Sequence, residues 1–250
     1  MSRTRAKWQL QTLGYQYGEE TVLRLSPVQF QEDFIGANNG AGFPGKYIAA
    51  ENTTSIWRTV ETNLNLAIAT VANAANGIVQ ITADADNNAE QGTIFFNDSL
   101  LFNLKQGLIF ECRAALHVLP TTVGELCSVY MGLASANAAI PNNIAVNAWF
   151  RLDGTGAILW ESDDATIDDD ANATGVTAVA DVYHIFRIDF TDWTTPKFYI
   201  DGVLVGTANM AALAAPSIQP FFRVDKQFAA ANTSIGTLYL DYVRVWQNRS

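Results

Sequence analysis

Alternation of apolar and polar residues with a period of two constrains this chain most. It runs through segments rich in Val, Ile, Phe, Tyr and Thr, which is typical of β-strands with one buried face. The clearest segments are residues 108–118, 126–133, 146–152, 183–190, 198–200, 221–224 and 238–246. Shorter ones are residues 56–58, 64–71, 77–82, 93–96 and 157–160. No long amphipathic helix competes with them, so we predict an all-β chain.

The turns between these segments are of the kind that joins antiparallel strands. Asp201-Gly202 separates Phe198-Tyr-Ile200 from Val203-Leu-Val205, and Asp-Gly between apolar strands is a strong hairpin signal because both residues tolerate positive φ. Asp153-Gly154 with Gly156 predicts a second, looser turn. Many short strands joined in this way leave a two-sheet sandwich or a barrel as the expected architecture.

The composition supports one main folded domain. The chain has 250 residues, of which 49% are hydrophobic, and 14 Phe, 8 Tyr and 6 Trp supply apolar surface for a sizeable core. The two cysteines, Cys112 and Cys127, are too few for a disulfide scaffold and form no CxxC metal pair. They could form a disulfide if their strands are neighbours in the right register, but we expect both to be small buried thiols.

Charge divides the chain into a short arm and an acidic body. Residues 1–28 hold four Lys or Arg against Glu19 and Glu20, which is +2, and the overall net charge of −10 leaves −12 for the rest. A body this acidic repels phosphate backbones, so we expect no nucleic-acid binding. We predict an N-terminal docking arm over residues 1–28 and a sandwich domain over residues 29–250.

The chain carries no recognisable membrane or export signal. Residues 1–8 lack the continuous apolar stretch of a secretory signal, and no later apolar run approaches the roughly 18 residues of a membrane span. We therefore expect a soluble protein that is made inside a cell.

The C-terminal third resembles a known fold family. Its sequence runs through Tyr183-His-Ile-Phe-Arg-Ile-Asp-Phe-Thr-Asp-Trp193, Pro196-Lys-Phe-Tyr-Ile-Asp-Gly-Val-Leu-Val205 and Leu238-Tyr-Leu-Asp-Tyr-Val-Arg-Val-Trp-Gln247. This series is similar to the closing strands of concanavalin A-like lectin and glucanase domains. Glu32-Asp33-Phe34 resembles their first strand, which pairs near the last. The resemblance implies a two-sheet antiparallel jelly-roll β-sandwich.

The catalytic patterns of such folds are missing. The glucanases in this family use a strand of the form E-[ILV]-D-x-x-E, and neither Glu161-Ser-Asp-Asp164 nor Glu111-Cys-Arg113 supplies the partner carboxylates. The lyases on similar folds need a His with Tyr and with Arg or Gln. His117 and His184 each stand inside an alternating strand, where a hydrogen-bonded structural imidazole is expected. We predict no catalytic residue and no enzymatic activity.

Binding sites have weaker signals. Calcium could be held by Asp84-Ala-Asp86-Asn-Asn88-Ala-Glu90 or by the acidic cluster of residues 163–170, but each is also typical of a solvated loop. Sugar binding would use an exposed aromatic residue such as Trp149, Trp160 or Trp193, all of which also suit a sandwich core. No triad, phosphate loop or zinc motif occurs, so we expect neither a metal nor a cofactor.

Together these features resemble concanavalin A-like proteins among the head and tail proteins of tailed bacteriophages. The resemblance implies a non-enzymatic virion protein on the capsid exterior, made in the host cytoplasm, most simply a decoration (cement) protein. Its expected partners are the major capsid protein or another virion protein, and further copies of itself, for example in a trimer. The residues expected to dock are Arg3, Arg5, Lys7, Trp8, Tyr15 and Tyr17.

Two other functions stay open. The alternative is a carbohydrate-binding adhesion module, which would bind a glycan through the sandwich. The third is a divergent glycoside hydrolase or polysaccharide lyase.

Overall fold

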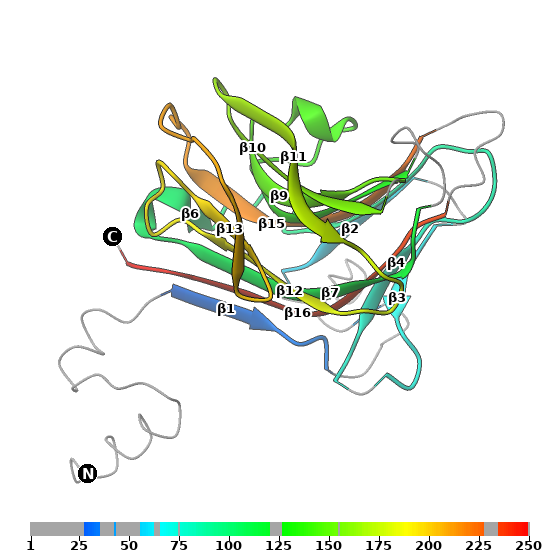
Figure 1. Ribbon diagram of the computed structural model, residues 1–250. Helices are drawn as coiled ribbons and strands as arrows, with labels where there is room; N and C mark the ends of the chain where they lie inside the picture. Colours follow the sequence, from blue (N-terminus) through cyan, green and yellow to red (C-terminus); the bar gives the residue numbers. More distant parts are fainter. Residues whose placement is uncertain are drawn as a thin grey trace, which may run out of the picture.

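The structure, a computed structural model, is a sandwich of two antiparallel β-sheets (Figure 1). It describes residues 28–35, 43, 56–62, 66–74, 76–120, 127–154, 156–227 and 235–249. These residues contain no α-helix, and their short 3-10 helices are η2 (Leu104–Gln106) and η3 (Pro141–Asn143). The prediction of an all-β sandwich is confirmed.

We name the first sheet sheet A. Its strand order is β14-β13-β12-β7-β16-β4-β3, and β1 also pairs with β16. The strands are β1 (Val28–Glu32), β3 (Ala67–Thr70), β4 (Val79–Thr82), β7 (Ile109–Val118), β12 (His184–Asp189), β13 (Lys197–Ile200), β14 (Val203–Thr207) and β16 (Thr237–Gln247). The first strand thus pairs with the last, with Val28 opposite Gln247, as the sequence resemblance implied.

Sheet B packs on sheet A and has the order β11-β10-β9-β8-β15-β5-β2, with β6 also paired to β15. Its strands are β2 (Arg58–Glu61), β5 (Glu90–Phe95), β6 (Phe102–Asn103), β8 (Cys127–Ala134), β9 (Val146–Leu152), β10 (Ala157–Asp164), β11 (Asp168–Thr177) and β15 (Ser217–Lys226). Residues 135–145, which include η3, lie over its outer face (Figure 1).

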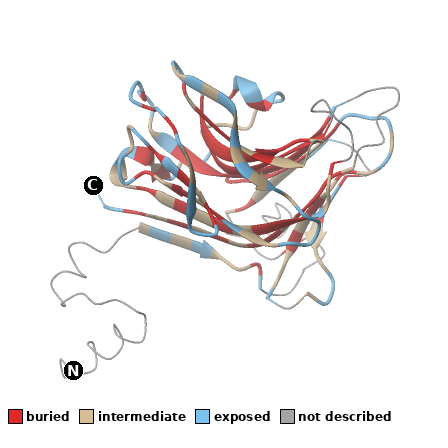
Figure 2. Ribbon diagram, in the orientation of Figure 1, coloured by how far each residue is buried: buried red, intermediate tan, exposed pale blue. Residues whose placement is uncertain are grey.

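The core fills the space between the sheets, where buried residues concentrate (Figure 2). Large inward side chains include Phe110 of sheet A and Phe150 and Phe222 of sheet B, all fully buried. A second apolar cluster lies on the outer face of sheet B, where Phe95, Phe221 and Trp149 pack against residues of the 135–145 segment. The central strands of sheet B are therefore buried on both faces, and β8 and β9 consist entirely of buried residues.

The predicted turns are present. Asp201 and Gly202 have φ values of 51° and 79° and join β13 to β14. The amide of Gly156 donates to the carbonyl of Asp153 at 3.1 Å in the turn between β9 and β10. Strand β11 was not predicted, because its Asp, Ala, Asn and Gly residues disfavour strands. It is an edge strand held by pairing with β10.

Both cysteines are buried and unpaired, as the sequence predicted. Cys112 lies on β7 in sheet A and Cys127 on β8 in sheet B, and both belong to the core between the sheets. Burial raises the pKa of the Cys127 thiol from 9.0 to about 12, and it raises the pKa of Cys112 as well. Neither thiol is therefore a nucleophile in the folded protein.

Candidate functional site

A cavity of about 580 Å³ lies on the outer face of sheet B. Strand alternation sends a side chain outward into it from each of five strands, while neighbours such as Met131, Phe150 and Val224 point into the core. These outward residues are Gln91 (β5), Tyr130 (β8), Trp149 and Arg151 (β9), Glu161 (β10) and Asp225 (β15), and the lining also includes Asp170 and Ala171 of β11 and Lys226 at the end of β15. We call this cavity the sheet B cleft.

Aromatic rings form the apolar floor of the sheet B cleft. The rings of Tyr130 and Trp149 meet edge to face with centroids 5.2 Å apart, and Trp149 also packs against Phe221 at 5.9 Å. Only 1% of Trp149 is exposed, so it supports the floor and does not project as a platform. An apolar floor with a few placed polar groups is the usual composition of a small-molecule site.

Glu161 is the most deeply placed acid in the cleft. Its Oε2 accepts the indole N–H of Trp149 at 2.6 Å, and its Oε1 lies 2.7 Å from Nη1 of Arg151 and accepts the amide of Ala171 at 3.2 Å. Burial raises the pKa of Glu161 above its ordinary value of 4.5, and Arg151 opposes that shift. Both carboxylate oxygens are thus engaged, so Glu161 positions Trp149 and Arg151 and presents no free oxygen to a substrate.

The acidic motif of glucanases remains incomplete in three dimensions. Asp163 shares the outward face of β10 with Glu161, but the third carboxylate position of the pattern is held by Thr166. Glu111 lies on the other sheet, where it accepts the Tyr242 hydroxyl at 2.9 Å. Neither Thr166 nor Glu111 therefore supplies the carboxyl that would complete the glucanase motif beside Glu161 and Asp163.

Arg223 fixes the segment that forms one wall of the cleft. Its Nη1 donates to the carbonyl of Ala138 at 2.5 Å, and its Nη2 donates to that of Ala139 at 2.8 Å and lies 3.1 Å from Asp225 Oδ2. Gln91 adds a hydrogen bond to the Ala139 carbonyl at 2.6 Å. The wall is therefore tied to β5 and β15 and is part of a preformed site.

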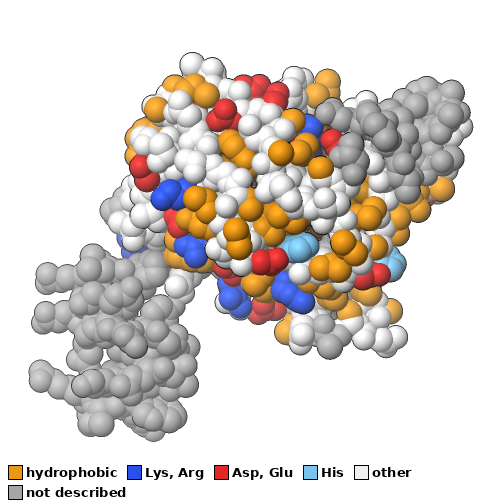
Figure 3. Space-filling model, viewed as in Figure 1, with side chains coloured by type: hydrophobic (Ala, Val, Ile, Leu, Met, Phe, Trp, Pro, Cys, Tyr) orange, Lys and Arg blue, Asp and Glu red, His pale blue; other side chains and the backbone are white. Residues whose placement is uncertain are grey.

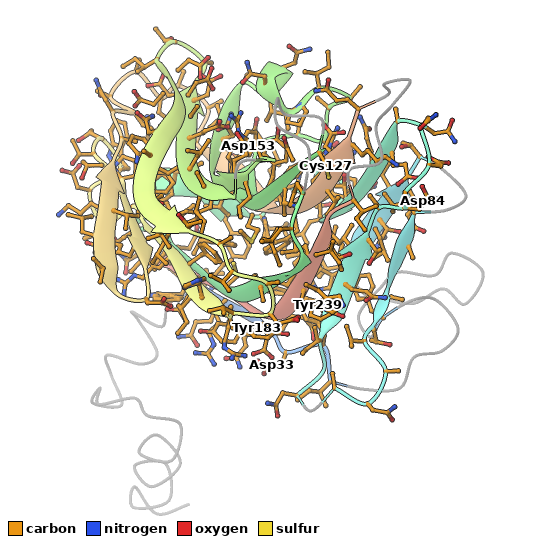
Figure 4. All side chains as sticks on the ribbon, turned by 45° about the vertical axis from the view of Figure 1, so that its right-hand side comes forward. Asp33, Asp84, Cys127, Asp153, Tyr183 and Tyr239 are labelled. Atoms are coloured by element: carbon orange, nitrogen blue, oxygen red, sulfur yellow. The ribbon has the colours of Figure 1, made fainter. Side chains whose placement is uncertain are left out.

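The loop of residues 84–90, weighed above as a calcium site or a solvated loop, contains a protein cation. Lys226, whose side chain is fully buried, donates from Nζ to the Asp84 carbonyl at 2.7 Å and lies 3.5 Å and 3.4 Å from carboxylate oxygens of Asp84 and Asp86. Glu90 completes a group of acids whose ligand atoms lie within 4.8 Å of one another. The ammonium stands where a metal ion would sit. Figure 4 shows Asp84 at the edge of the sandwich.

The second acidic cluster is a hairpin. Asp163 and Asp164 end β10, and Asp168 to Asp170 begin β11, with Asp163 opposite Asp168. Asp164 is buried and accepts the amides of Ile167 and Ala212 at 2.8 Å and 2.9 Å. This aspartate stabilises the turn, as a structural reading of the cluster predicts.

Both histidines lie on sheet A, away from the cleft. His117 Nδ1 is 2.7 Å from Asp181, and its ring stacks on Tyr239 at 4.6 Å. His184 Nδ1 is 2.6 Å from Asp201. Each imidazole has a carboxylate partner, which is the structural role expected from the sequence. Figure 4 shows Tyr239 and Tyr183 on this same side of the molecule.

The remaining sequence candidates have different outcomes. Trp160 is a core residue stacked on Phe198 at 5.0 Å, and the half-buried Trp193 lies under the Lys105 ammonium at 4.4 Å. Neither reaches the sheet B cleft, so only Trp149 of the three lines it. The predicted docking residues Arg3, Arg5, Lys7, Trp8, Tyr15 and Tyr17 lie outside the described residues.

Sequence reasoning missed most of the cleft. Tyr130, Arg151 and Asp225 occupy outward positions of strands that are buried along almost their whole length. A charged residue in such a strand was the available signal, since burial of Arg and Asp demands a partner. The sequence does not say which strands are neighbours, so it could not pair Arg151 with Glu161.

Sequence comparisons provide no relatives. No family model matches the chain, and no curated protein is similar to it in sequence. None of the described helices is long and apolar enough to cross a membrane.

Solved structures share the fold at low sequence identity. A protein of unknown function from Shewanella oneidensis MR-1 superimposes with a TM-score of 0.60 and 11% identity, covering 99% of this chain and 95% of its own. A family 16 endo-glucanase from Bacteroides ovatus has a TM-score of 0.55 and 13% identity, covering 86% and 99%. The Emp47p carbohydrate recognition domain has a TM-score of 0.52 and 10% identity, covering 85% and 99%.

The fold is the concanavalin A-like jelly roll. Lectin-type domains and glycoside hydrolases both use this jelly roll, so the likeness establishes the architecture and leaves the activity to the chemistry of the site.

Proposed function

We propose that this protein is a non-enzymatic glycan-binding module whose ligand occupies the sheet B cleft. The observation that carries the proposal is the cleft itself, an open cavity of about 580 Å³ with Tyr130 and Trp149 at its floor and polar side chains around it. Aromatic rings pack against the apolar C–H faces of a sugar, and carboxylate and amide oxygens accept hydrogen bonds from its hydroxyl groups. The Emp47p domain, which has the same fold, is a carbohydrate recognition domain.

The contacts of the buried acids in the cleft favour binding of a glycan without its hydrolysis. Both carboxylate oxygens of Glu161 contact Trp149, Arg151 or the Ala171 amide, and Asp225 is paired with Arg223. A general acid or nucleophile must reach the reacting bond with a free oxygen. These acids hold the walls of the cleft in place.

The test is a glycan screen with a blocked cleft. Ala139 and Ala145 are both exposed on the 135–145 segment, but only Ala139 lines the cleft. Ala139→Trp is expected to abolish binding of any glycan the wild type retains, while Ala145→Trp leaves it unchanged. Equal binding by both variants, or release of reducing ends from a bound glycan, would contradict the proposal.

We further propose that the module is carried on a virion, most simply as a capsid decoration protein that docks through residues 1–28 onto the major capsid protein or another copy of itself. The supporting observation is the point of attachment. β1 begins at Val28 and pairs with β16 in sheet A, whereas the cleft opens on the outer face of sheet B. Attachment through the N-terminal segment would therefore leave the cleft free to face outward.

Light scattering tests the arm. The full chain is expected to form a closed oligomer or to bind capsids, and a triple variant Arg3→Glu, Arg5→Glu, Lys7→Glu is expected to lose that association. The matched control is Lys197→Glu, since Lys197 is exposed on β13 of the body. Unchanged association of the triple variant would refute the docking role of the arm.

A further inference from the structure

The charges around the sheet B cleft determine which glycans it can accept, an inference that rests on the proposed function. Arg151, Arg223 and Lys226 are the cations of this region. Their side chains are 9%, 1% and 0% exposed, so none of them offers an open positive charge to a ligand.

Each of these cations is turned toward a protein acceptor. Arg151 pairs with Glu161 at 2.7 Å, and Arg223 pairs with Asp225 at 3.1 Å besides binding two backbone carbonyls. Lys226 points into the loop of Asp84 and Asp86. A uronate or sulfate group in the cleft would have to displace one of these acceptors to gain a partner, and the displaced carboxylate would then be buried without one.

The polar groups that stay accessible are acceptors or amides. Asp170 is exposed at the rim, and Asn142 is exposed on η3. Asp225 is only 8% exposed, and its carboxylate is paired with Arg223. Among the described residues of the cleft, no exposed cation would offset the repulsion of an anionic ligand by Asp170, by Asp225 and by the acidic loop, in a protein whose net charge is −10.

We propose that the sheet B cleft selects uncharged, hydroxyl-rich glycans and excludes chains of uronic acids or sulfated sugars. Sugar hydroxyls donate to Asp170 and to the side-chain amides, and the sugar rings rest on Tyr130, whose ring packs against the buried Trp149. The carboxylates that hold the three cations inward are therefore specificity-determining residues.

Calorimetric titration of the full chain at pH 7 tests the proposal. The neutral probes are cellohexaose, laminarihexaose and mannohexaose, and the anionic probes are the hexamers of mannuronate and galacturonate. At least one neutral hexamer is expected to bind tenfold or more tightly than either anionic hexamer. Tighter binding of an anionic hexamer would overturn the selectivity and leave the glycan-binding function standing, whereas binding of no hexamer of either class would overturn both.

Two variants shift the charge of the cleft. Asp225→Asn releases Arg223 from its partner and is expected to raise affinity for the uronate hexamers severalfold. Asp170→Asn removes an exposed negative charge from the rim, and it is expected to reduce the difference in affinity between the neutral and the anionic hexamers. Asp192→Asn is the control, because Asp192 is exposed on the loop between β12 and β13 of sheet A and its amide can still bond Thr194. If neither cleft variant changed the ratio of the affinity for neutral hexamers to the affinity for anionic hexamers, the proposal would be contradicted.

Discussion

At the scale of residues, the cleft depends on charged side chains that pair with and orient one another. Glu161 orients Trp149 and Arg151, and Asp225 holds Arg223. Lys226 takes the place of a metal ion among Asp84 and Asp86. Removal of one member of such a buried pair exposes the other to an apolar environment and costs more than the pair contributes.

Lys226 leads to a prediction about calcium. Because its ammonium already pairs with Asp84 and Asp86 at the centre of the loop, millimolar Ca²⁺ or a chelator is expected to leave the Tm of the wild type unchanged. Lys226→Met is expected to lower the free energy of unfolding by about 2 kcal/mol, because Asp84 and Asp86 then lack their cation. Ca²⁺ is expected to restore part of that loss by binding to the folded variant. Thermal scans measure both effects, with Lys197→Met as the exposed control. A Ca²⁺-dependent rise in the wild-type Tm would contradict this account.

Glu161 leads to a prediction about pH. Burial raises the pKa of Glu161 above 4.5, so its carboxyl binds a proton more tightly in the folded than in the unfolded chain. Its contribution to stability is therefore largest below pH 4.5 and is lost as the pH rises through the folded pKa. The free energy of unfolding of the wild type relative to Glu161→Gln is expected to fall between pH 4 and pH 7. A difference that grows over that range would show that the pKa is lowered.

At the scale of elements, the segment 135–145 forms one wall of the cleft on the outer face of sheet B. Ile144 is 1% exposed in the second apolar cluster, whereas Ile140 on the same segment is 57% exposed. Asp98 also binds this segment, by accepting the amide of Asn137 at 3.0 Å. The wall is thus packed like a core element although it is a connection between strands.

The packing of this wall can be measured with a matched pair. Ile144→Ala is expected to cost about 2–4 kcal/mol in urea unfolding, because it leaves a cavity between the wall and sheet B. Ile140→Ala is expected to change the free energy of unfolding by no more than about 0.5 kcal/mol, because the side chain of Ile140 is exposed to solvent. Equal effects for the two variants would mean that the segment does not pack on the sheet.

At the scale of the whole molecule, the two outer faces differ. Sheet B carries the cleft, while sheet A carries ion pairs and stacked rings, such as Arg113 over Tyr183 at 4.2 Å and Arg244 over Tyr242 at 4.4 Å. Acidic and basic side chains are interspersed on the view of Figure 3. Because β1 pairs with β16 in sheet A, the proposed attachment through residues 1–28 and the proposed ligand binding in the cleft would use separate surfaces.

The two thiols report on opening of the whole sandwich. Cys112 and Cys127 belong to different sheets but to one core. We expect both to resist a disulfide reagent at pH 8 and to react together, at a rate that follows global unfolding in urea. Selective reaction of one thiol in the native protein would show that the sheets open separately.

The sequence predicted the architecture better than the site. Period-two segments and the Asp201-Gly202 turn identified most strands, because burial of one face imposes that pattern locally. β11 was missed because its residues depend on pairing with β10. The cleft joins Trp149, Glu161 and Asp225 across three strands through register, which no local pattern encodes.

The most direct test of the central claim is an NMR titration that follows the tryptophan indole N–H signals. Trp149, which donates to Glu161 in the cleft, would be assigned with Trp149→Phe, and the core residue Trp160 serves as the internal control. The account predicts that a neutral hexasaccharide shifts the Trp149 signal in a saturable way and leaves the Trp160 signal in place. Saturable binding that leaves the Trp149 signal unmoved would place the ligand elsewhere and contradict the account.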